Sequence, residues 1–186
     1  MEKKGQTKTI AYMAMYVALY VLLKFVGNMI PFLQMPNGGS IELELVALFV
    51  ASYHLGAKNG VLVAGLSLLL QFALGFNFYI VSFMQFLLDY ALPIVVVGAC
   101  ASYFKKGTKS YYYITVVIAM ILKWLCNVLS GVYYWPPEDG AAGSSIAWAF
   151  SVGYNTPYNL ATLVVCLILV PLLVQRLKKS NINFIA

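Results

Sequence analysis

Long apolar segments alternate with short polar, glycine-rich or proline-rich stretches along this chain. A helix that crosses the hydrocarbon core of a bilayer needs about 20 predominantly apolar residues. Uninterrupted apolar runs of this length predict helices rather than strands. The pattern therefore predicts an all-α integral membrane protein with six transmembrane helices, at approximately residues 8–26, 41–56, 60–76, 79–104, 111–133 and 146–175.

The composition agrees with a membrane protein. Of the 186 residues, 62% are hydrophobic and 10% are charged, against roughly 45–50% and 25% in soluble domains. A soluble fold of this size has too little interior to hide so much apolar surface. We therefore exclude a cytosolic globular protein and expect residues 1–186 to form a single transmembrane six-helix domain in the lipid bilayer. No removable signal peptide is expected.

Basic residues mark one side of the predicted bundle. The chain has 12 Lys and Arg residues, and all but Lys24 and Lys123 lie at or beyond the cytoplasmic ends of the predicted segments. They are Lys3, Lys4, Lys8, Lys58, Lys105, Lys106, Lys109, Arg176, Lys178 and Lys179. The loops on the other side, 27–40, 75–78 and 133–145, contain no Lys or Arg. By the positive-inside rule both termini are predicted to be cytoplasmic in a multi-pass protein of the cell membrane.

The sequence lacks the usual motifs of enzyme chemistry. It contains no GxxxxGK[ST] phosphate loop, no HExxH and no GxSxG, and its single His leaves no catalytic triad. The three Cys residues show no metal or redox spacing. We expect no enzyme activity, no metal and no cofactor, and the scattered lysines do not suggest a nucleic-acid partner.

Five ionisable residues lie within or at the edge of the apolar segments: Lys24, Glu42, Glu44, Asp89 and Lys123. Each costs at least a few kcal/mol at membrane depth, so each needs a partner or a function. Glu44 is expected to complement a helix N-terminus and to pair with Lys24. Asp89 has two interpretations: a carboxylate that binds a cationic ligand, or a structural ion pair with Lys123 or Lys24.

Aromatic residues favour the ligand interpretation. Tyr90 follows Asp89 directly, and Tyr79 and Trp135 lie near the outer ends of predicted helices. Aromatic faces around a buried carboxylate suit a flat, positively charged ligand. The alternative is an aromatic belt at the membrane interface, which many membrane proteins have.

The last two segments carry further polar residues. Lys123 and Asn127 are four residues apart and share a helix face, and Gly131 allows another helix to approach closely. Asn155 and Asn159 also lie one turn apart. Such residues either join helices or contact a ligand, and joining helices is favoured for Asn159. In the first segment, Ala14 and Ala18 form a small-xxx-small step that permits helix contact.

Three stretches, QFLLDY (85–90), KWLCNVLSGVYYW (123–135) and FSVGYN (150–155), carry a family resemblance. Over nearly its whole length the chain resembles the thiamine-specific S components of energy-coupling-factor (ECF) vitamin transporters. The resemblance implies a six-helix subunit that holds the vitamin near its outer face. It also implies docking, through the first helix, to a transmembrane coupling subunit driven by two ATPase subunits.

The resemblance also implies the residues of the site. The expected substrate-binding residues are Tyr79, Asp89, Tyr90, Asn127, Gly131, Trp135, Phe150 and Asn155, and the expected partner-docking residues are Ala11, Ala14, Met15 and Ala18. Three positions depart from the family pattern. Asn127 replaces a common histidine, Phe150 replaces a common tyrosine, and Gly38 stands where some members have tryptophan.

The expected function is high-affinity capture of thiamine from the extracellular side and its uptake as an S component of an ECF-type ABC transporter. Thiamine carries a permanent positive charge, which a dry site must balance with a carboxylate such as Asp89. Its aminopyrimidine edge suits an asparagine amide. The alternatives are an S component for another vitamin or a thiamine precursor such as a pyrimidine, and a non-transporting structural subunit in which Asp89 pairs with Lys123.

Overall fold

The computed structural model describes residues 2–104 and 110–180, and regular structure in these ranges is helical apart from one isolated bridge between Gln34 and Ser40. Lys105, Lys106 and Lys109, which the sequence places on the cytoplasmic side, lie outside the described residues. The longer helices are α1 (Glu2–Met29), α2 (Glu44–Leu55), α3 (Ala57–Ala73), α6 (Tyr111–Tyr134) and α7 (Ser145–Lys179). One further helix is built from α4 (Phe83–Phe86), a π-helical turn η3 (Leu87–Ala91) and α5 (Leu92–Gly98).

Short 3-10 turns complete the described chain. Two of them, η1 (Pro31–Leu33) and η2 (Pro36–Gly38), shape the loop between α1 and α2, and η4 (Cys100–Ser102) follows α5. Each of the six predicted apolar segments therefore corresponds to a helix. Within the described ranges, Gly5–Met29, Tyr111–Tyr134 and Ser145–Lys179 are long and apolar enough to cross a membrane, whereas the other apolar helices are shorter.

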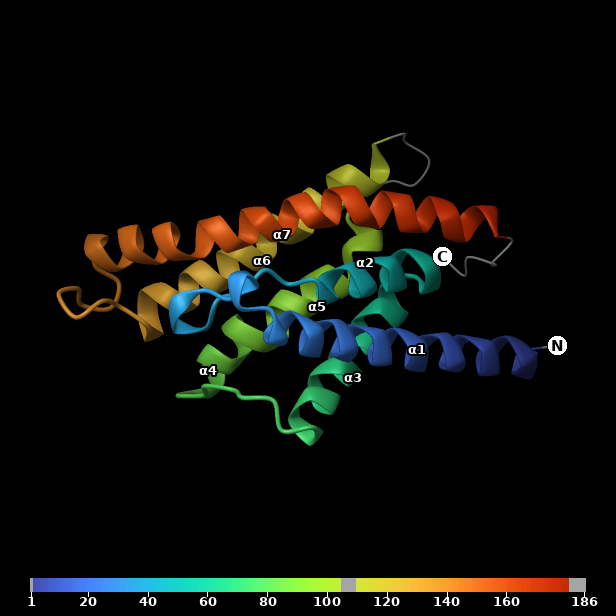
Figure 1. The fold of residues 1–186 in the computed structure, drawn as a ribbon, viewed down its shortest axis with the longest axis horizontal. Coiled ribbons are helices and arrows are strands. Elements are labelled where there is room, and N and C mark those ends of the chain that lie inside the picture. The colour runs from blue at the N-terminus through green and yellow to red at the C-terminus, as the bar shows by residue number, and fades with distance from the viewer. Residues whose placement is uncertain (1, 105–109, 181–186) are drawn as a thin grey trace.

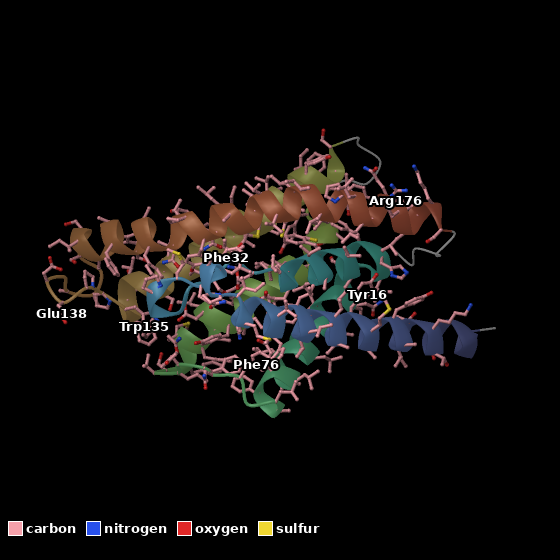
Figure 2. All side chains as sticks on the ribbon, in the orientation of Figure 1. Tyr16, Phe32, Phe76, Trp135, Glu138 and Arg176 are labelled. Atoms are coloured by element: carbon pink, nitrogen blue, oxygen red, sulfur yellow. The ribbon has the colours of Figure 1, made fainter. Side chains whose placement is uncertain are left out.

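The molecule has two distinct ends (Figure 1). The helix α1 begins, and α7 ends, at the same end of the bundle, and the loops that precede α2, α4 and α7 lie towards the other end. Figure 2 shows Trp135 and Glu138 near one end and Arg176 near the other. This arrangement separates the aromatic and acidic residues from the basic end of α7.

The core of the bundle is built around α2. Every residue of this helix is buried, and Leu45, Leu48 and Phe49 are completely covered. The helix packs against α1, α3, α5 and α7, while α6 and α7 pack extensively on each other. A mostly apolar helix that is buried on all sides is typical of the centre of a bundle.

Both ends of one predicted helix differ from the structure. The segment predicted at 79–104 becomes helical only at Phe83, and its helix ends at Gly98. Ser82 is the N-cap, in an extended conformation, and its hydroxyl accepts a hydrogen bond from the backbone N–H of Gln85 at 3.1 Å. A serine that caps the first turn in this way fixes the start of a helix. The apolar residues before Ser82 extend the apolar run and therefore made the predicted start too early.

A glycine contact joins α3 to α5. A Cβ atom at Gly98 would lie 2.7 Å from the carbonyl oxygen of Gly60, and a Cβ atom at Gly60 would collide with the carbonyl oxygen of Gly98. The two backbones can approach this closely only because neither residue has a side chain. The contact holds the helix that carries Asp89 against α3.

We therefore expect Gly60→Ala to destabilise the protein by about 1–3 kcal/mol, because the added methyl group overpacks a backbone contact. Thermal unfolding of the purified protein in detergent measures the effect as a lower Tm. Gly65→Ala, in the same helix, is the matched control, since nothing lies within 4 Å of its Cβ position. Equal Tm values for the two variants would contradict the close packing.

Candidate functional site

The Asp89 carboxylate joins two helices. Asp89 lies in the π-helical turn, half-buried, and its Oδ2 accepts hydrogen bonds from Gln85 Nε2 at 2.6 Å and from Trp135 Nε1 at 3.0 Å. Trp135 is the C-cap residue of α6, and its backbone N–H donates to the carbonyl oxygen of Gly131 at 3.2 Å. The carboxylate, the indole and the end of α6 thus form one cluster.

The ion pair considered for Asp89 does not form. Lys24 pairs with Glu44 at 2.9 Å, as the sequence predicted, and Lys123 pairs with Glu42 at 2.5 Å. Within residues 2–104 and 110–180, Asp89 forms no ion pair. The structural alternative, in which Asp89 balances Lys123, is therefore wrong, and no Lys or Arg in the described part of the chain pairs with Asp89.

Tyr90 fastens the extended stretch before α4. Its hydroxyl accepts a hydrogen bond from the backbone N–H of Tyr79 at 3.0 Å, and its ring meets Phe78 edge-on at 5.0 Å. Phe78 in turn stacks on Phe72 of α3 at 4.0 Å. The Tyr79 side chain itself is 71% exposed. The aromatic contacts place Tyr79 beside the turn that carries Asp89.

Lys123 is the centre of a second, buried polar cluster. Its ammonium group donates to Asn127 Oδ1 at 3.0 Å and Asn159 Oδ1 at 2.9 Å, in addition to its contact with Glu42. The residue is 1% exposed, and three acceptors satisfy the three N–H groups of an ammonium. The cluster ties the turn before α2 to both α6 and α7, and it shows Asn159 joining helices as predicted.

Asn155 lies where α7 packs against Gly131 of α6. Its Nδ2 donates to the carbonyl oxygen of Ser151 at 2.8 Å, and its Oδ1 accepts a hydrogen bond from the hydroxyl of Tyr158. A Cβ atom at Gly131 would lie 3.3 Å from Asn155 Nδ2 and would collide with Ser151 Oγ. Gly131 therefore permits the close helix approach that its residue type indicated.

The loop between α1 and α2 rests on α7. The Tyr154 hydroxyl accepts a hydrogen bond from the backbone N–H of Gly39 at 3.0 Å and donates to the carbonyl oxygen of Pro36. Phe150, 43% exposed, stacks over Tyr154 at 6.2 Å. Gly38 has a φ of 98°, a conformation that glycine adopts without strain and larger residues avoid.

One face of α1 has no partner within the described chain. Ala11, Ala14, Met15 and Ala18 are all exposed on it. The opposite face of the helix, with Tyr16, Val17 and Tyr20, is buried in the core. The small residues predicted for docking therefore remain available on the outer surface of the bundle.

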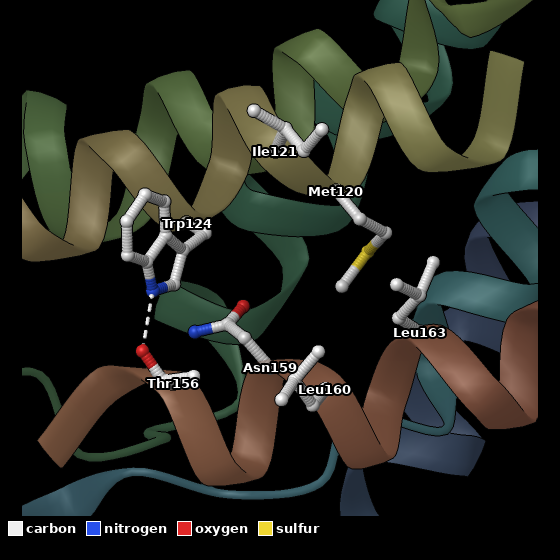
Figure 3. Close-up of a pocket in the computed structure, with 7 residues that line it drawn as sticks. All are labelled: Met120, Ile121, Trp124, Thr156, Asn159, Leu160 and Leu163. Carbon is white, nitrogen blue, oxygen red and sulfur yellow. Dashed lines mark hydrogen bonds between the residues drawn. The ribbon is translucent and has the colours of Figure 1, made fainter. Parts of the chain in front are cut away.

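A small hollow between α6 and α7 lies apart from the Asp89 cluster (Figure 3). Its volume is about 120 Å³, and Trp124 Nε1 donates to Thr156 Oγ1 at 3.1 Å across it. The lining residues are Met120, Ile121, Trp124, Thr156, Asn159, Leu160 and Leu163. Sites for drug-sized ligands are typically about 300–1,000 Å³, and this hollow has no charged lining residue.

Comparison with known proteins defines the family. The model of the thiamine transporter protein family (Thia_YuaJ) matches residues 10–182. The chain belongs to the thiamine transporter protein family. It is also 30% identical to the thiamine transporter ThiT of Bacillus subtilis (strain 168) over 195 residues, which cover 97% of this chain and 99% of that protein.

A solved structure agrees with this assignment. ThiT from Listeria monocytogenes has the same fold with a TM-score of 0.75, at 20% sequence identity, covering 94% of this chain and 97% of that chain. The family resemblance in the sequence is thereby confirmed. Membership of the thiamine transporter family makes this a multi-pass membrane protein and indicates a transport protein rather than an enzyme.

Three contacts in the structure of this thiamine transporter family member are not predicted by the sequence analysis: those of Gln85, Glu42 and Tyr154. Gln85 was not recognised, although it precedes Asp89 by four residues on a helix and so shares its face. Glu42 was not assigned as the partner of Lys123, because three carboxylates competed for two lysines. Tyr154, which holds the loop before α2, gave no local signal, since its partners are backbone groups far away in the sequence.

The buried ion pair gives a stability prediction. Lys123→Met leaves the Glu42 carboxylate without its cation, so we expect a loss of about 3–5 kcal/mol, the usual cost of breaking a buried pair from one side. Thermal unfolding in detergent measures it. The double variant Glu42→Gln/Lys123→Met removes both charges and should recover part of the loss. A single variant as stable as the unchanged protein would show that the pair is not buried.

Proposed function

We propose that this chain captures thiamine at the extracellular side of the cell membrane and acts as the S component of an ECF-type transporter. Membership of the thiamine transporter family supports the substrate. The observation that carries the proposal is the Asp89 carboxylate, which has two neutral hydrogen-bond donors and, among the residues that the structure describes, no ion-pair partner. A cationic ligand would supply the missing charge.

The chemistry of thiamine suits this cluster. Its thiazolium ring is permanently charged and cannot enter a dry site in neutral form, so an opposing carboxylate is needed. Aromatic faces strengthen the attraction for such a ring, and Trp135 and Tyr90 lie next to Asp89 in the structure. We propose that the substrate-binding residues are Tyr79, Asp89, Tyr90, Asn127, Gly131, Trp135, Phe150 and Asn155.

In this proposal an amide reads the aminopyrimidine half. Asn155 Oδ1 accepts from Tyr158 and retains a second lone pair, which suits an amino group of the ligand. Asn127 supplies a polar group on the facing helix, where its Oδ1 accepts from Lys123. The glycine at 131 keeps the two helices close enough for both amides to serve one ligand.

The topology belongs to the same proposal. Residues 1–186 form one domain of six membrane-spanning helices, with both termini in the cytoplasm. Two observations support this topology. The start of α1 and the end of α7 lie at the same end of the bundle, and the loops 27–40, 75–78 and 133–145 contain no Lys or Arg. Asp89 and Trp135 then lie towards the extracellular side.

Transport requires an energy source that the sequence does not contain. Without a phosphate-binding loop, the chain depends on two separate ATPase subunits and a transmembrane coupling subunit. We propose that the exposed small-residue face of α1, with Ala11, Ala14, Met15 and Ala18, docks to that coupling subunit. Small residues let a partner helix approach closely.

Asp89→Asn tests the site. Because the substitution removes the charge opposite the thiazolium and keeps the shape, we expect thiamine affinity to fall by about 2–5 kcal/mol. Isothermal titration calorimetry of the purified chain without ATP measures it. Asp139→Asn, an exposed acid of the outer loop, is the matched control and should bind normally.

Unchanged affinity in Asp89→Asn would contradict the site assignment. Tighter binding of the isolated pyrimidine half than of thiamine would instead favour a precursor transporter.

The docking face gives a separate prediction. Ala14→Trp should leave thiamine binding by the purified chain unchanged, since the Ala14 side chain is exposed on the outer surface of α1. Uptake by vesicles that contain the complete transporter should be lost, because the indole blocks close helix approach. Val164→Trp, on an exposed part of α7, is the control. Normal uptake in Ala14→Trp would exclude this face.

A further inference from the structure

Gln85 contacts the Asp89 carboxylate from within the same helix and is itself completely buried, at 0% exposure. Its Nε2 donates to Asp89 Oδ2 at 2.6 Å, and its Oε1 accepts from the backbone N–H of Val81 at 3.2 Å. A carboxylate can only accept and a backbone N–H can only donate. The two partners therefore permit a single orientation of the Gln85 amide.

The backbone around Gln85 is equally constrained. Its own N–H donates to the hydroxyl of Ser82, which caps the helix start. The π-helical turn Leu87–Ala91 follows directly and carries both Asp89 and Tyr90. Single π-helical turns are frequent at functional sites because they redirect side chains. Gln85 thus connects the extended stretch before α4 to the turn that presents the carboxylate.

The two donors to Asp89 leave one of its oxygen atoms to a ligand. Both hydrogen bonds, from Gln85 and from Trp135, fall on Oδ2, and no described residue donates to Oδ1. Both donors are neutral, so they stabilise the ionised carboxylate without cancelling its charge. A Lys or Arg at position 85 would neutralise Asp89, whereas a buried amide orients it and leaves its charge to a ligand.

We propose that Gln85 is a positioning residue for the cation-binding carboxylate. It holds the Asp89 carboxylate turned so that Oδ1 faces the ligand. This inference rests on the proposed function, since it takes the cation to be thiamine.

Binding of two ligands that differ in charge distinguishes a positioning role of Gln85 from a role in folding. Thiamine is the first probe, and its uncharged analogue, with a thiophene ring in place of the thiazolium, is the second. Gln85→Met keeps the side-chain length and removes both hydrogen bonds. We expect thiamine affinity to fall about tenfold, a usual effect of losing a hydrogen bond to a charged group, and affinity for the analogue to change less than about twofold.

Gln71→Met is the matched control. Gln71 is another buried glutamine, in α3, whose Nε2 donates to the carbonyl oxygen of Ser67 at 3.2 Å. Its loss should leave the ratio of the two affinities unchanged. If Gln85→Met does not fold, Gln85→Asn provides the same comparison, because its amide is one methylene too short to reach Asp89.

A double-mutant cycle completes the test. In an Asp89→Asn background, Gln85→Met should cause no further loss of thiamine affinity, because the carboxylate that it positions is gone. Equal weakening of thiamine and the uncharged analogue, or additive losses in the double variant, would overturn the positioning role. Failure of the unchanged protein to bind thiamine would instead overturn the proposed function.

Discussion

Charge buried among apolar helices needs an opposite charge or a full set of hydrogen bonds, and the rest of this structure depends on how that need is met. Glu42 and Glu44 lie two residues apart where α2 begins, and they reach in different directions. Glu44 pairs with Lys24 of α1, and Glu42 pairs with Lys123 of α6. The central helix is thereby fixed to helices on two sides of the bundle.

This distribution of charge leaves Asp89 as the acid in the bundle that a ligand can neutralise. Neutral donors, Gln85 and Trp135, orient its carboxylate. The π-helical turn places Tyr90 next to it, and Tyr90 holds the stretch that contains Tyr79. Polar contacts that would be unremarkable in water become specific here, because a bilayer or a packed interior offers no water to replace them. In the proposed function, recognition of a cation follows from the same constraint that organises the helices.

The length of the apolar segments was sufficient to predict the helices, because a membrane helix needs a long apolar run. It was insufficient at residues 79–82, which are not helical although most of them are apolar. The backbone N–H groups of Tyr79 and Val81 bond to the side chains of Tyr90 and Gln85, so these two groups are satisfied without a helix. Only tertiary contacts reveal that.

The site shows the same division between local and distant signals. Asp89 could be identified because burying a carboxylate is costly. Gln85 could have been identified because residues four apart on a helix share a face. Trp135 contacts Asp89 from 46 residues away; its aromatic side chain near a helix end and the family resemblance both pointed to it, but neither predicted the hydrogen bond to Asp89. The partner of Lys123 could not be chosen from the sequence, since any of three acids satisfied the need for a counter-charge. The fold resolves the choice by placing Glu42 beside α6.

A crystal structure of this protein with thiamine bound tests the role of Asp89 most directly. We predict the thiazolium ring within about 4–6 Å of Asp89 Oδ1, the range over which opposite charges interact strongly, with Trp135 and Tyr90 beside it. Lys123 should remain paired with Glu42. Thiamine bound in the hollow beside Trp124, or Asp89 paired with a lysine while thiamine lies elsewhere, would contradict it.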